Sequence, residues 1–75
     1  MTLIEQVRLS RSLPPRGLAA AIRRSAGVSR ESLAEELGIH PVTVARWEQG
    51  SRTPRGKLRV RYAQLLAELA AEVSH

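Results

Sequence analysis

The chain has 75 residues, of which 43% are hydrophobic and 25% charged, and it contains no cysteine. This length suffices for one domain that buries only about 60% of its unfolded surface, which leaves little room for a roofed catalytic cavity. The missing cysteines exclude disulfides and thiolate metal sites and are compatible with a reducing, cytoplasmic setting.

The charge distribution favours a polyanionic partner. The formal net charge is +5, and basic surfaces accumulate next to phosphate. The cations cluster: Arg52, Arg55, Lys57, Arg59 and Arg61 lie within ten residues that contain no acid. Genomic bias can explain why arginine outnumbers lysine, but not the clustering. No apolar stretch is long enough to span a membrane, and MTLIEQVRLSR lacks the apolar run of a secretory signal, so we expect a cytoplasmic protein.

Residues 1–12 are expected to form either a mobile arm or a short helix. Thr2 followed by Glu5 fits a capping box, and Leu3, Ile4 and Val7 repeat at helical spacing. Proline restricts the residue before it and lacks a backbone donor, so Pro14 ends this segment.

The next helix is expected to begin at Pro15, since proline is favoured in a first turn. Leu18 and Ile22 are predicted to mark its inner face, and Gly27 to stop it near residue 26. This helix opens the segment 13–75, which we interpret as one domain.

Two short helices follow. Ser29 is a suitable N-cap for a helix over residues 30–37, and Gly38 a suitable left-handed C-cap. His40 and Pro41 then open a helix through Gln49.

A last helix is predicted from about residue 55 to about residue 73, after a turn over residues 50–54. It carries one apolar stripe, formed by Leu58, Tyr62, Leu65, Leu66, Leu69 and Val73. The pattern contains no strand, so the sequence predicts an all-α fold of five helices.

The segment RESLAEELGIHPVTVARWEQ has the pattern of a helix-turn-helix. A steep crossing of two helices needs a small residue at the crossing, a residue that tolerates positive φ in the turn, and apolar side chains closing the inner angle. All seven positions fit these demands: Leu33, Ala34, Leu37, Gly38, Ile39, Val44 and Trp47. A generic helical hairpin would not be expected to match at every position.

From residue 18 to residue 69 the chain resembles the Cro and phage-repressor type of helix-turn-helix proteins. The resemblance rests on IRRSAGVSRESLAEELGIHPVTVARWEQGSRTP, with its Leu-Ala, Leu-Gly-Ile, Trp-Glu-x-Gly and Pro elements. It implies a compact bundle of four or five helices that binds double-stranded DNA, often as a homodimer on a palindromic operator. On this basis residues 13–75 are a helix-turn-helix DNA-binding domain with a C-terminal helix.

Three residues are predicted to contact bases. With Val44 and Trp47 turned inward, the fourth helix leaves Pro41, Val42 and Arg46 on its outer face. Side chains near the start of such a helix meet base edges in the major groove. Arg46 could fork onto guanine O6 and N7, a contact that contributes about 1–3 kcal/mol of discrimination, while Pro41 and Val42 could meet a thymine methyl.

Phosphate contacts are expected on both sides of this helix. Arg30 starts the preceding helix, where free backbone donors attract anions, and Thr43 offers a hydroxyl. The resemblance adds Arg52, Thr53 and Arg55, in the turn where family members touch the backbone. The alternative for these residues is a solvated basic loop.

Further roles are assigned to structure and assembly. The resemblance implies that Arg23 and Glu48 form an ion pair between two helices. Leu69 and Val73 either complete the core or face a second copy. His40 and His75 are far apart and have no acids at ligand spacing, so neither a metal site nor a cofactor is expected.

The leading functional hypothesis is a sequence-specific DNA-binding regulator, such as a phage or bacterial repressor. The alternatives are an accessory factor in site-specific recombination, or an antitoxin that also binds a protein. No nucleophile–base pair, metal cluster or phosphate loop is present. We therefore expect neither an enzyme nor a small-molecule substrate.

Overall fold

The computed structural model describes residues 1–74, in which five α-helices and no strand are found. They are α1 (Leu3–Arg11), α2 (Arg16–Ser25), α3 (Arg30–Leu37), α4 (Pro41–Gln49) and α5 (Gly56–Val73). The predicted all-α fold with a helix-turn-helix is therefore confirmed. His75, one of the two histidines considered as metal ligands, lies outside the described residues.

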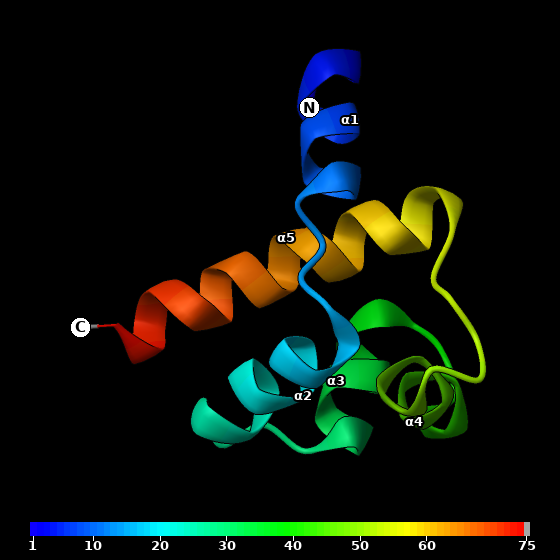
Figure 1. Ribbon diagram of the computed structural model, residues 1–75, viewed down its shortest axis with the longest axis vertical. Helices are drawn as coiled ribbons and strands as arrows, with labels where there is room; N and C mark the ends of the chain where they lie inside the picture. The colour runs from blue at the N-terminus through cyan, green and yellow to red at the C-terminus, as the bar shows by residue number, and fades with distance from the viewer. Residues whose placement is uncertain (75) are drawn as a thin grey trace.

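The long helix α5 divides the molecule (Figure 1). Helices α2, α3 and α4 lie together on one side of α5, and α1 stands on the other. None of the helices in residues 1–74 has the combination of length and apolar character that crossing a membrane requires.

The core is small and mostly aliphatic. Leu33, Val44 and Leu66 are its largest fully buried side chains. The two aromatic rings, Trp47 and Tyr62, lie together with their centroids 4.8 Å apart and their planes tilted by 40°. This pair joins α4 to α5, so the position of α4 is fixed by the central helix.

Helix α1 forms but is not part of the core. The Thr2 hydroxyl accepts a hydrogen bond from the Glu5 amide at 3.2 Å, as an N-cap does. No residue of α1 is buried. The Arg59 guanidinium holds its C-terminal end by donating to the Ser10 carbonyl at 2.9 Å.

The prediction for α2 was wrong in two respects. Pro15 is the N-cap residue rather than the first helical residue. Leu18 is 54% exposed rather than on the inner face, whereas Ile22 is partly buried and packs against the core as predicted; the buried residues of α2 are Ala19, Ala20 and Arg23. Ala19 belongs to the same buried cluster as Trp47 and Tyr62, whereas Leu18 lies in a surface groove beside Ala70 and Val73 of α5.

Candidate nucleic-acid interface

Local capping sets the ends of α3 and α4. The Ser29 hydroxyl accepts from the Ser32 amide at 3.0 Å, which starts α3. Gly38 ends it with φ 71°, a left-handed conformation that glycine adopts without strain. His40 Nδ1 then accepts from the Val42 amide at 3.1 Å, so a histidine caps the start of α4.

The crossing of α3 and α4 is tightly closed. Ala34 and Val44 are both fully buried at 0% exposure. Leu33, Leu37 and Trp47 are buried around them, and Ile39 is packed against the same cluster while partly exposed. Because Ala34 has only a methyl group, the two helices approach closely where they cross.

The opposite face of α4 is open to solvent. Val42 is 46% exposed and Arg46, one turn later, is also exposed. Residues four apart lie on one side of a helix, so these two share the outer face. Pro41 and Thr43 flank it and are partly buried.

A buried carboxylate ties α2, α3 and α4 together. Glu48 of α4 accepts from Arg23 Nε at 2.6 Å and from Arg23 Nη2 at 3.1 Å. Arg30 Nε donates to the same carboxylate at 2.9 Å. The Glu48 side chain is 2% exposed and that of Arg23 is 9% exposed, whereas that of Arg30 is 40% exposed.

The electrostatics of this cluster favour the charged form of Glu48. Burial by itself raises the pKa of the carboxyl, but the hydrogen bonds from Arg23 and Arg30 outweigh burial and lower the pKa below its usual 4.5. The same carboxylate raises the pKa of Arg23 through its hydrogen bond, against the opposing effect of burial. The cluster therefore stays ionised at neutral pH.

Sequence reasoning missed the contact between Arg30 and Glu48. Arg30 was expected to face phosphate, yet its Nε is held by the carboxylate. The terminal nitrogens of Arg30 have no hydrogen-bond partner among residues 1–74. No sequence signal joins two residues 18 positions apart on different helices, so only the packing of α3 on α4 could reveal this contact.

The turn after α4 is fixed at its base and open at its tip. Gly50 has φ 82°, and a Cβ there would meet the end of the Arg16 side chain. Arg16 donates to the Gln49 carbonyl at 3.2 Å, and so caps the end of α4. Pro54 is buried, while the predicted phosphate contacts in this turn are all exposed, namely Arg52, Thr53 and Arg55.

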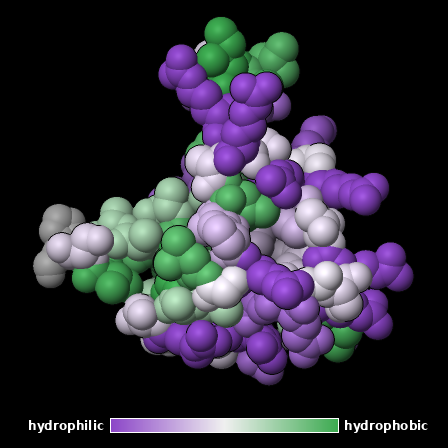
Figure 2. Space-filling view, viewed as in Figure 1, coloured by the Kyte–Doolittle hydropathy of each residue, from purple (hydrophilic) through white to green (hydrophobic). Residues whose placement is uncertain are grey.

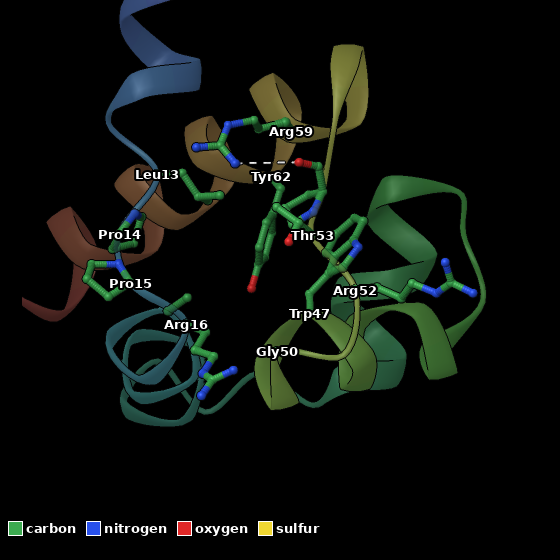
Figure 3. A pocket seen from close by; sticks show the side chains of 12 residues that line it. Leu13, Pro14, Pro15, Arg16, Trp47, Gly50, Arg52, Thr53, Arg59 and Tyr62 are labelled. Carbon is green, nitrogen blue, oxygen red and sulfur yellow. Dashed lines mark hydrogen bonds between the residues drawn. The ribbon is translucent and has the colours of Figure 1, made fainter.

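A cavity of about 410 Å³ lies behind this turn (Figure 3). Arg59 donates across its upper side to the Pro54 carbonyl at 3.5 Å. The Tyr62 hydroxyl points into the cavity, and the Arg52 side chain extends away from it. The cavity lining therefore anchors the turn, while Arg52 projects outward.

The structure contains a helix-turn-helix with a closed inner angle. Its second helix, α4, carries an exposed valine and an exposed arginine, and a cationic turn follows this helix. Together these features define a DNA-binding protein of the transcription-regulator type. The family model described as helix-turn-helix matches residues 20–70, which is more than half of the chain. The chain therefore belongs to the Cro/C1-type helix-turn-helix family, as the sequence predicted. It has no significant match among curated proteins or solved structures.

Proposed function

We propose that the chain is a sequence-specific, repressor-like regulator of phage or bacterial type that reads duplex DNA with the outer face of α4. The observation that carries this proposal is the solvent exposure of Val42 and Arg46 on a helix whose other face is fully buried. A rigid helix presenting a forked guanidinium suits the major groove, where guanine offers two adjacent acceptors.

Phosphate contacts would then hold this helix in register. Arg52, Thr53 and Arg55 are exposed just beyond α4, and Arg30 presents its free terminal nitrogens at the start of α3. Thr43 flanks the reading face. Such contacts orient a protein on DNA without reading its sequence.

The test compares selection of bound sites from random duplexes by the unaltered protein and by Arg46→Ala. This variant should fold normally and lose preference at one or two base pairs, by about 1–3 kcal/mol. Arg52→Ala should weaken all duplexes about equally and reduce the salt slope by about one. Arg24→Ala, which removes the same charge from an exposed position on α2, is the matched control and should leave sequence preference unchanged.

Other results would point elsewhere. Duplex affinity that hardly changes with salt would contradict phosphate binding. Affinity without any sequence preference would leave only an architectural role, and a DNA-bending assay would then test the recombination accessory factor.

A second copy of the chain is the protein partner that we propose. Symmetric operators are read by paired domains. Leu69 is partly buried and Val73 is 46% exposed, so Val73 is the more available of the two residues predicted to face another copy.

A further inference from the structure

The cavity behind the turn after α4 receives a polar group that the protein itself does not use. Tyr62 is only 2% exposed, yet its hydroxyl makes no hydrogen bond within residues 1–74 and points into this cavity (Figure 3). A tyrosine hydroxyl in a folded core usually finds a partner. The pKa of Tyr62 is raised to about 12, so at neutral pH the hydroxyl keeps its proton. It is therefore a hydrogen-bond donor directed at whatever occupies the cavity.

The charge around the cavity is positive. Arg16, Arg52 and Arg59 line it, and no acidic residue of the described chain does so. Arg52 extends away from the cavity (Figure 3), so Arg16 and Arg59 supply the charge beside it. Arg16 donates one terminal nitrogen to the Gln49 carbonyl, and Arg59 donates to carbonyls of two other segments. Because a guanidinium has five N–H donors, both residues keep donors for a further acceptor. The cavity therefore favours a negatively charged occupant.

The walls of the cavity are largely apolar. Leu13, Pro14 and Pro15 lie on one side of it in Figure 3, and the ring of Trp47 lies on the other. Its volume of about 410 Å³ falls within the range of small-molecule sites, about 300–1,000 Å³. A bare inorganic anion would leave these apolar walls in contact with water. The lining therefore suits an organic molecule that carries its negative charge at one end.

The start of α2 adds a further attraction for an anion. Pro15 is the N-cap residue and makes no side-chain hydrogen bond, so no side chain caps the first amides of α2. The positive end of the helix dipole lies at the same point. A helix start alone would not specify a ligand, but the Tyr62 hydroxyl enters the cavity from a different helix, α5. Donors from two elements thus converge on one space.

We propose that this cavity binds a small organic acid, whose carboxylate accepts hydrogen bonds from Tyr62 and Arg16 and whose apolar body lies against Trp47. A carboxylate is a stronger acceptor than a carbonyl for both donors. A phosphate of the DNA backbone has no apolar body, and it would meet Arg52 on the outer side of the turn. The proposal goes beyond DNA binding and does not depend on it.

The larger groove beside α1 lacks these features. Figure 2 shows apolar side chains gathered at the free end of α1, away from the bundle. There Leu3 and Val7 help to line a groove of about 520 Å³. None of the described residues that line this groove is buried, so no polar group held by the core is directed into it. The presence of Tyr62 therefore distinguishes the cavity behind the turn.

The test titrates the protein with phenylacetate at constant ionic strength and without DNA. Trp47 is the single tryptophan and lines the cavity, so its fluorescence should change saturably as phenylacetate binds. Phenylacetamide has nearly the same shape but no charge. It should bind about tenfold more weakly, because hydrogen bonds to a charged acceptor are the stronger ones. Calorimetry of the same titrations would measure both affinities independently of Trp47.

Three variants separate a ligand site from a structural role. Tyr62→Phe removes a hydroxyl that makes no hydrogen bond within the described chain, so the urea midpoint should not fall, whereas phenylacetate should bind about tenfold more weakly. Arg16→Gln should weaken binding about twofold to fivefold, as expected for an exposed cation. Arg24→Gln removes the same charge from an exposed position of α2 that does not line the cavity, and it should bind phenylacetate normally.

Three results would overturn the proposal: no saturable binding of phenylacetate, equal affinities for phenylacetate and phenylacetamide, or full affinity in Tyr62→Phe. Inorganic phosphate provides a further test, because it carries charge without an apolar body. If phosphate displaces phenylacetate at equal concentration, the cavity is a general anion site and the proposal is wrong. Failure of duplex binding would refute the proposed function and leave all of these results unaffected.

Discussion

Replacing Glu48 by glutamine should destabilise the fold more than any other isosteric change at the interface. The amide keeps the size of the side chain but removes the negative charge that three arginine nitrogens contact, at 2.6, 2.9 and 3.1 Å. Arg23, with its side chain 9% exposed, would be left as a buried cation without its counterion.

The expected loss follows from this burial. Removing one partner of a buried pair costs about 3–5 kcal/mol. The free energy of unfolding of a small domain is about 5–15 kcal/mol in total, so the Glu48→Gln variant should lose a large share of its stability. Each kcal/mol shifts the Tm by about 4–8 °C for a domain of this size. Urea unfolding followed by the fluorescence of the single, buried Trp47 would measure the difference.

The difference in the free energy of unfolding between the unaltered protein and Glu48→Gln should also depend on pH. The pKa of Glu48 is lowered in the folded protein from its usual 4.5. Its ionisation therefore stabilises the fold fully above about pH 4.5, and this contribution is lost as the pH falls through the lower, folded value. Glu48→Gln has no such group, so the two stability curves should converge as the pH falls below 4.5.

The control is Arg23→Met combined with Glu48→Met. Replacing both buried charges by apolar side chains is often neutral or stabilising, so this double variant should be more stable than Glu48→Gln. If Glu48→Gln lowers the free energy of unfolding by less than about 1 kcal/mol at neutral pH, the pair contributes no more than an exposed ion pair does. That result would refute the assignment of this cluster to the buried scaffold.

Three further predictions concern the scaffold. Ala34→Leu should cost about 1–3 kcal/mol by overpacking the fully buried crossing, and an unchanged urea midpoint would contradict the close approach of α3 and α4. Gly38→Ala should cost about 1–2 kcal/mol from its φ of 71° alone, because no atom lies within 4 Å of the added methyl; calorimetry would detect a lowered Tm, and no change would argue against the left-handed turn. Burial raises the pKa of Tyr62 to about 12; the negative charge of Glu48 adds to this rise, and the positive charge of Arg23 opposes it. The free energy of unfolding should therefore fall as the pH rises above 10. Absorbance titration of this single tyrosine should show no ionisation near pH 10 while the protein stays folded.

The sequence alone was sufficient for what local interactions decide. Ser29 and Gly38 set the two ends of α3, because capping interactions act within a few residues. The apolar pattern around Ala34 and Val44 predicted which faces would meet, because helical spacing fixes which side chains share a side. From these features the fold class and the family could be predicted.

Other features depended on tertiary packing. The inner face of α2 was predicted wrongly in part because Leu18 has the right character for a core, yet the packing of α2 leaves it 54% exposed in a surface groove beside Val73, while Ala19 and Ala20 are buried. Arg30 shares the carboxylate of Glu48 because the packing of α3 on α4 brings these two residues together, one helical turn from the crossing at Ala34 and Val44. A residue's own neighbours in sequence determine its helix, whereas the side chains that reach it across a crossing determine its partners, and these become defined only when the helices pack together.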